Sequence, residues 1–147
     1  MKTISLTVFT LLIGTFFISC SKDQSLTDTN TELLTKKSWK FETYGLDENN
    51  NGVIDAGESN MMPCEADDFF TFNKDGSGYF MGGDAECTPG EPAVTNFTWT
   101  LSNNGTELAI FAAPEKITRL DDKVLEVYYM DQNSQGLEVK YIRRFNH

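Results

Sequence analysis

Short runs in which apolar and polar residues alternate recur along most of the chain, a pattern typical of half-buried β-strands. Turn signals such as Asp75-Gly76 and Asn103-Asn104-Gly105 separate these runs. The pattern predicts eight strands, over residues 38–46, 68–73, 77–81, 95–102, 107–111, 115–120, 123–130 and 137–145.

The first run shows how the alternation assigns side chains to faces. In residues 38–46 the period of two places Trp39, Phe41 and Thr43 on the inner face and Tyr44 on the outer face. In residues 95–102 it places Phe97, Trp99 and Leu101 inside by the same reasoning.

The connections between the strands indicate the fold class. Apart from a helical turn expected at 31–36, no helical pattern is long enough to form a crossover, so consecutive strands should pair as an antiparallel meander. Eight strands are enough for a meander to close into a small barrel, and closure removes exposed strand edges. The predicted fold class is an all-β, eight-stranded antiparallel barrel, with a β-sandwich as the alternative.

The turn at Asp75-Gly76 allows two registers for the hairpin around it. A two-residue turn would pair Phe72 with Tyr79. A type I turn with Gly76 in a left-handed bulge would instead place Phe70, Phe72 and Phe80 together on one face. We favour the second register because it separates apolar from polar side chains more cleanly.

The first 19 residues have the layout of an export signal. Lys2 is followed by an apolar run over residues 4–18, which is too short to span a bilayer comfortably, and Ser19-Cys20 ends the segment. A small residue before a cysteine resembles a bacterial lipobox, so we expect residues 1–19 to be removed and Cys20 to be lipidated and anchored in the membrane. A plain signal peptide or an uncleaved anchor is the alternative.

Residues 20–31 contain no aromatic residue and few apolar ones, so we expect a flexible lipidated tether ahead of a domain over residues 32–147. Ser21-Lys22-Asp23 resembles a surface-export signal, and an ordinary polar linker is the alternative. The predicted location is the outer membrane, facing either the periplasm or the cell surface.

Charge restricts the partners. Removal of residues 1–19, which carry one lysine and no acid, would take the formal charge from −10 to −11. Such an acidic chain is a poor partner for nucleic acids, which bind through positive charge.

Cys64 lies as many residues before Asp75 as Cys87 lies after Gly76, so an antiparallel hairpin with its turn at Asp75-Gly76 brings the two cysteines opposite one another. Export favours a disulfide between them, because disulfides persist outside the cytoplasm. Two free buried cysteines are the alternative.

Residues 47–58 match the twelve-residue calcium loop of the EF-hand type, with Gly52 at its sharp turn. Calcium prefers oxygen ligands, so the expected cofactor is a structural calcium ion. The flanks are not helical, and an Asn-rich and Gly-rich flexible loop is the alternative. The expected ligands are Asp47, Asn49, Asn51, Val53 through its carbonyl, Asp55 and Glu58.

Other candidate chemistry is weaker. Five acids near the cysteines, Glu65, Asp67, Asp68, Asp84 and Glu86, would form either an acidic rim or a solvated end of the fold. The lone histidine is the last residue, and no nucleophile and base pattern or phosphate-binding loop is recognisable. We therefore predict no enzymatic activity.

Several segments in order resemble the lipocalin-like domain of Bacteroidetes lipoproteins. They are Leu33-Leu34-Thr35 before Trp39, Cys64-Glu65-Ala66-Asp67-Asp68 before Phe70-Thr71-Phe72-Asn73, then Cys87, Thr98-Trp99 and Ile117-Thr118. The resemblance implies a small antiparallel barrel.

Two functions are consistent with this reading. The first is a lipid-anchored barrel that holds a small apolar or amphipathic ligand against inward aromatic residues. The second is a filled barrel that serves as a scaffold for contact with an envelope protein or a glycan. The candidate ligand-binding residues are Trp39, Phe41, Phe72, Phe80 and Trp99.

Overall fold

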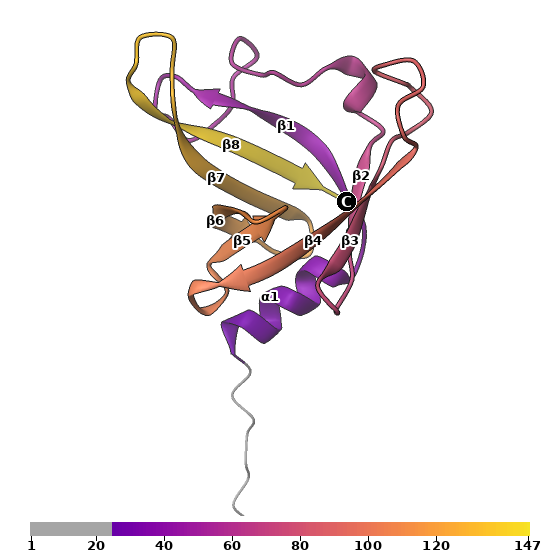
Figure 1. Ribbon diagram of the computed structural model, residues 1–147. Coiled ribbons are helices and arrows are strands. Elements are labelled where there is room, and N and C mark those ends of the chain that lie inside the picture. The colour runs from indigo at the N-terminus through magenta and orange to yellow at the C-terminus, as the bar shows by residue number, and fades with distance from the viewer. Residues whose placement is uncertain (1–24) are drawn as a thin grey trace, which may run out of the picture.

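The computed structural model describes residues 25–147, whose eight strands form one closed antiparallel β-barrel in the order β1 to β8 (Figure 1). The predicted meander is confirmed, and the β-sandwich alternative is excluded. No helix within residues 25–147 has the length and apolar character needed to cross a membrane. The elements are α1 (Leu26–Thr35), β1 (Trp39–Asp47), η1 (Pro63–Glu65), β2 (Phe69–Phe72), β3 (Ser77–Met81), β4 (Val94–Ser102), η2 (Asn103–Gly105), β5 (Glu107–Ile110), β6 (Ala113–Leu120), β7 (Val124–Gln132) and β8 (Glu138–Asn146).

Helix α1 covers one end of the barrel, which we call the closed end (Figure 1). The loops from β1 to β2, from β3 to β4 and from β7 to β8 gather at the other, open end. The Ser25 hydroxyl accepts a hydrogen bond from the Asp28 N–H at 3.1 Å and caps the helix start. Leu34 is fully buried against the barrel, and Asn30 donates to the Gly105 carbonyl at 2.8 Å.

The helix corrects part of the predicted tether. Residues 26–31 are helical, and the single turn expected at 31–36 is the C-terminal part of a ten-residue helix. The polar composition was misleading because the buried Asn30 has a specific backbone partner, which offsets the cost of its burial. Residues 20–24 lie outside the described part of the chain.

The core fills the closed end. Both tryptophans are buried, and the indole of each has a backbone partner. Trp39 donates to the Leu34 carbonyl at 3.0 Å. Trp99 donates to the carbonyls of Asn73 and Ser77 at 3.0 and 2.9 Å, so it ties β4 to the β2–β3 turn. These bonds satisfy the polar edge of each ring inside the core.

The β2–β3 hairpin has the register that we favoured. Phe70 lies opposite Phe80, and Phe72 lies opposite Gly78. Gly76 has a φ of +83°, and the Asn73 N–H donates to the Ser77 carbonyl at 2.8 Å, as a turn with a left-handed bulge requires.

A β-bulge in β1 corrects the predicted facing of one residue. The pairing of β1 with β8 shifts between Phe41 and Thr43, which inserts one residue and reverses the alternation beyond it. Tyr44, expected outside, therefore lines a cavity inside the barrel, and Thr43 does not.

Candidate ligand-binding site

Two pairs of neighbouring strands part at the open end. β1 pairs with β2 only through Trp39 and Lys40, although β1 continues beside β8 as far as Asp47. β6 pairs with β7 only from Lys116 onward, so residues 113–115 pair with β5 alone. Pro114 has no N–H to donate to a neighbouring strand. The three strands β7, β8 and β1 are consequently separated from the rest of the barrel at this end.

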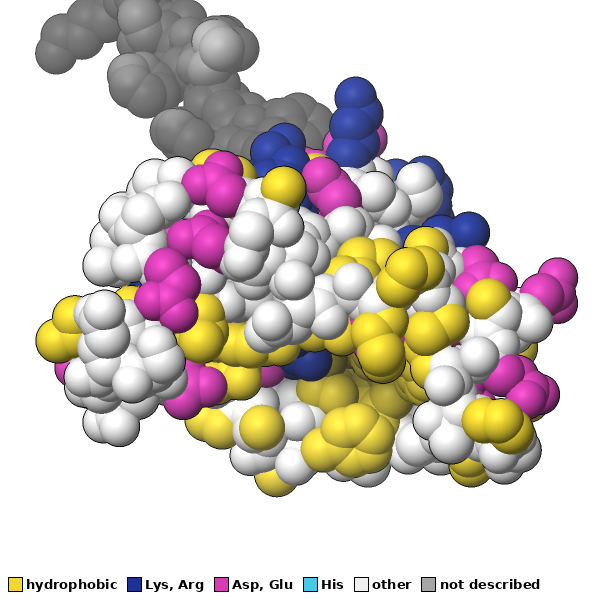
Figure 2. Space-filling model, turned by 90° about the horizontal axis from the view of Figure 1, so that it is seen from above, with side chains coloured by type: hydrophobic (Ala, Val, Ile, Leu, Met, Phe, Trp, Pro, Cys, Tyr) yellow, Lys and Arg dark blue, Asp and Glu magenta, His cyan; other side chains and the backbone are white. Residues whose placement is uncertain are grey.

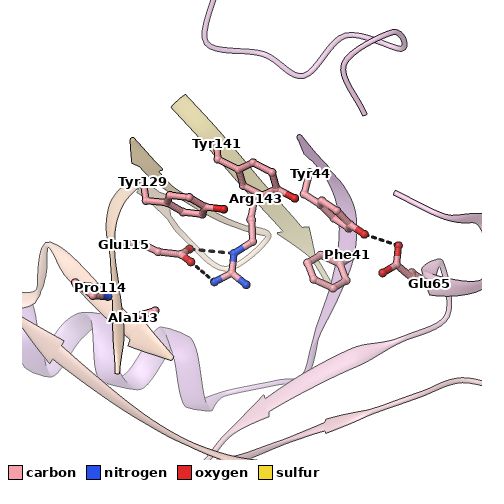
Figure 3. Close-up of a pocket in the computed structure, with 9 residues that line it drawn as sticks. All are labelled: Phe41, Tyr44, Glu65, Ala113, Pro114, Glu115, Tyr129, Tyr141 and Arg143. Atoms are coloured by element: carbon pink, nitrogen blue, oxygen red, sulfur yellow. Dashed lines mark hydrogen bonds and ion pairs between the residues drawn. The ribbon is translucent and has the colours of Figure 1, made fainter. Parts of the chain in front are cut away.

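Two cavities of about 520 and 410 Å³ open between the separated layers. Figure 2, seen from above the open end, shows a hollow lined mainly by hydrophobic side chains. The cavities share Phe41, Ala113, Glu115 and Arg143. The larger is also lined by Tyr44, Glu65, Pro114, Tyr129 and Tyr141 (Figure 3). The smaller is also lined by Phe70, Phe80, Thr95, Ile110 and Phe111.

An arginine and a glutamate form a forked ion pair at the wall that the two cavities share. Nε of Arg143 in β8 donates to Oε2 of Glu115 in β6 at 3.0 Å, and Nη2 donates to Oε1 (Figure 3). Glu115 is 6% exposed and the Arg143 side chain is 21% exposed. Burial raises the pKa of Glu115, although Arg143 acts to lower it. The Glu115 carboxylate is therefore largely removed from solvent.

Three tyrosines surround the ion pair. The Tyr44 hydroxyl donates to Oε2 of Glu65 at 2.6 Å, and burial together with Glu65 raises the pKa of Tyr44. The rings of Tyr129 and Tyr141 stack with their centroids 5.0 Å apart. Burial also raises the pKa of Tyr129. The phenols of Tyr44 and Tyr129 therefore stay protonated at neutral pH, and each of the three tyrosines presents a hydroxyl beside apolar ring surface.

The β5–β6 turn at the edge of the smaller cavity is strained. Its two residues, Phe111 and Ala112, have φ values of +52° and +63°, which non-glycine residues rarely adopt. The Phe111 N–H donates to the Thr98 carbonyl at 3.1 Å, and its ring lies 5.7 Å from that of Phe97. Strain of this kind persists only where surrounding contacts impose it, and it is common at binding sites.

The five aromatic residues expected to bind ligand divide into two groups. Phe41 lines both cavities and Phe80 lines the smaller one. Trp39, Phe72 and Trp99 line neither cavity and instead fill the closed end, where each is at most 6% exposed.

Neither residue of the ion pair was identified as a candidate from the sequence. Every second residue of β8 faces inward, including Tyr141, Arg143 and Phe145. A charged residue between two inward aromatic residues was therefore a usable signal of a polar site inside the barrel. Its partner Glu115 follows Pro114 at the start of β6, which begins two residues earlier than the predicted strand.

The disulfide between Cys64 and Cys87 is present, with a Cα–Cα distance of 5.3 Å. It joins η1 to the β3–β4 loop. Glu65, the next residue, accepts hydrogen bonds from both Tyr44 and the Met62 N–H. The disulfide therefore helps to hold one wall of the larger cavity.

Residues 47–58 form a tight loop that closes on its own side chains. The two carboxylate oxygens of Asp47 accept from the N–H groups of Asn51 and Gly52, both at 2.9 Å. The Glu58 carboxylate accepts from the N–H groups of Asn49 and Asp55 at 3.3 and 3.0 Å. Within residues 25–147, no three His, Cys, Asp or Glu side chains gather closely enough to hold a metal ion as placed.

The acids near the disulfide serve mainly to hold a loop. Oδ2 of Asp67 accepts from the N–H groups of Asp84 and Ala85, and Oδ1 of Asp68 accepts from the Gly83 N–H at 2.9 Å. Burial raises the pKa of Asp68. These bonds attach the β3–β4 loop to the segment that leads into β2.

Comparison with known proteins agrees with the architecture. A family model described as a lipocalin-like domain matches residues 34–140, well over half of the chain. No curated protein matches the chain. Cys20 and the leader lie outside both the match and the described residues.

Proposed function

The chain belongs to the lipocalin-like domain family, and we propose that it is a non-enzymatic protein that binds a small apolar or amphipathic ligand at the open end of its barrel. Lipocalin-like barrels are in general binding folds without catalytic activity. The observation that carries the proposal is the pair of cavities between the separated strands. Each falls within the range of about 300 to 1,000 Å³ that is common for small-molecule sites.

The test is binding of N-phenyl-1-naphthylamine, an uncharged dye that fluoresces in apolar surroundings. Addition of the full-length chain should enhance its fluorescence with saturation. Ala113 lines both cavities and carries only a methyl group, so Ala113→Trp should fill the site and weaken dye binding at least tenfold. Ala109 pairs with Pro114 on the neighbouring strand and lines neither cavity, so Ala109→Trp is the matched control. Unenhanced fluorescence with the unaltered chain would refute the proposal.

The alternative function is a scaffold whose filled barrel presents loops to an envelope protein or a glycan. Large exposed side chains at Phe111, Met130 and Leu137 favour such contacts. The same dye experiment separates the two functions, because a scaffold with a filled interior would not bind the dye.

We further propose that lipidated Cys20 anchors the domain to the outer membrane, facing the periplasm or the cell surface. The apolar run ending in Ser19-Cys20 supports this. Cys20→Ala should move the protein from the membrane fraction to the soluble fraction. Full membrane retention of that variant would contradict the anchor.

We also propose that residues 47–58 bind a structural calcium ion. Besides the motif, support comes from the ordered loop, in which the Asn49 and Asn51 amides both donate to Oδ2 of Asp55 at 2.9 and 3.1 Å. Three of the six expected ligand residues are therefore already in contact, and calcium would bind through their oxygens in place of these amide hydrogen bonds. Calcium would neutralise the carboxylates there and hold the loop to β1.

Calcium at ten times its dissociation constant should stabilise the chain by RT ln 11, about 1.4 kcal/mol. Glu58→Ala should abolish the resulting rise in melting temperature. Glu48→Ala is the control, because the Glu48 carboxylate faces away from the loop and accepts a hydrogen bond from Asn133. Equal melting curves with and without millimolar calcium would contradict the calcium site and favour the interpretation of residues 47–58 as a flexible loop.

A further inference from the structure

We infer that the larger cavity selects an uncharged, ring-containing ligand with a carbonyl or hydroxyl oxygen, which accepts a hydrogen bond from Nη1 of Arg143. This inference rests on the proposed function and specifies the chemistry of the ligand at the same site.

The guanidinium of Arg143 has one nitrogen that Glu115 does not engage. Nε and Nη2 of Arg143 are both bonded to Glu115, whereas Nη1 has no hydrogen-bond acceptor within residues 25–147. In Figure 3 this third nitrogen points away from Glu115 into the space near Phe41. Nη1 is not among the buried unpartnered atoms, so it is open to water; a ligand that displaces this water would leave a charged donor unpaired unless it supplies an oxygen acceptor.

The charges that line the larger cavity disfavour an ionised ligand. Arg143 is the single cationic residue among those that line the larger cavity, and it already neutralises Glu115, while Glu65 adds a second carboxylate. A ligand carboxylate would therefore add a third negative charge where burial already disfavours ionised Glu115. A ligand ammonium has donors only, so it could not accept the hydrogen bond from Nη1 and would be repelled by the guanidinium. An uncharged acceptor avoids both penalties.

Aromatic rings on two sides of the larger cavity favour a ligand that contains a ring. Tyr129 and Tyr141 stack on one side of the cavity, and Phe41 stacks on Phe145 with a centroid distance of 4.8 Å. The exposed ring faces favour a flat partner by stacking. Neither the Tyr129 nor the Tyr141 hydroxyl has a protein hydrogen-bond partner within residues 25–147, and both residues line the cavity (Figure 3).

The test uses four probes that share a naphthalene ring and differ at position 2: acetyl, isopropyl, carboxylate and 1-aminoethyl. Binding to the full-length chain is measured at pH 7 by displacement of N-phenyl-1-naphthylamine. One hydrogen bond from a charged donor is sufficient for roughly a tenfold preference. We therefore expect 2-acetylnaphthalene to bind at least about tenfold more tightly than each of the other three.

A conservative substitution tests whether Arg143 causes the preference for the acetyl probe. Arg143→Lys keeps a positive charge for Glu115 but has a single terminal nitrogen, which Glu115 occupies, so the preference for acetyl over isopropyl should fall to near unity. The readout is the ratio of the two affinities within one variant, so a change in dye affinity does not affect it. Arg144→Lys is the matched control, because Arg144 bonds to Glu42 and Glu126 and lines neither cavity.

The outcomes are distinct. Three results would overturn this inference and leave the proposed function standing. They are dye binding without a preference for the acetyl probe, tighter binding of the carboxylate or amine probe, and a preference that survives in Arg143→Lys. Absence of dye binding by the unaltered chain would overturn the proposed function instead.

Discussion

Removal of the Cys64–Cys87 disulfide should lower the free energy of unfolding by about 3.4 kcal/mol at 25 °C. This magnitude follows from the chain entropy of closing a loop with a sequence separation of 23. The cross-link restricts the unfolded chain, so its removal leaves the unfolded state with more conformations to lose on folding.

The assay is urea unfolding of the Cys64→Ser/Cys87→Ser variant, followed by the fluorescence of the two buried tryptophans. With an m-value of about 1.5 kcal/mol/M, the predicted loss moves the midpoint down by about 2 M. The m-value itself should rise, because an unfolded chain without the cross-link exposes more surface. The unaltered chain in excess reductant should behave like the variant.

An unchanged urea midpoint would refute this reasoning. A second readout is dye affinity, because the disulfide also positions Glu65 at the cavity wall. Loss of dye affinity with full stability would show that the disulfide acts on the site and not on the unfolded chain.

Three further predictions concern single residues. Arg119 and two backbone N–H groups hold the pKa of Asp121 at about 2, below its ordinary 3.8, so its contribution to stability is complete above pH 3.8 and is lost as pH falls through 2. Asp121→Asn should reduce the dependence of the urea midpoint on pH between 4 and 2. Ala112→Gly should hold or raise the melting temperature because it relieves a φ of +63°, whereas Ala109→Gly inside β5 should lower stability by about 1 kcal/mol. Leu34→Ala should cost about 3 kcal/mol in urea unfolding because it leaves a cavity under α1, and a cost below about 1 kcal/mol would contradict the role of the helix as a packed cover.

The number of strands, their order and the main turns were predictable because they depend on local patterns. Alternation of apolar residues marks each strand, and Gly76 marks the bulged turn that fixes the β2–β3 register. The pairing of Cys64 with Cys87 followed from their positions about that turn. The lipid anchor and the calcium ion remain predictions.

The binding site was only partly predictable because it depends on where strands stop pairing. The bulge after Phe41 turns Tyr44 inward, and no alternation pattern signals one inserted residue. Separation of β6 from β7 creates the cavity that Glu115 faces, and pairing between strands is a property of the assembled barrel.

The sequence by itself determined an eight-stranded antiparallel barrel with a stapled hairpin, because residues close in sequence impose strands and turns. Only the tertiary structure decided that aromatic residues divide between a filled closed end and a hollow open end. It also decided that Arg143 meets Glu115, 28 positions earlier in the chain. The pair forms because β6 leaves β7 ahead of Lys116, so that Glu115 faces Arg143 on β8; where two strands stop pairing is set by the assembled barrel and is not encoded in local patterns.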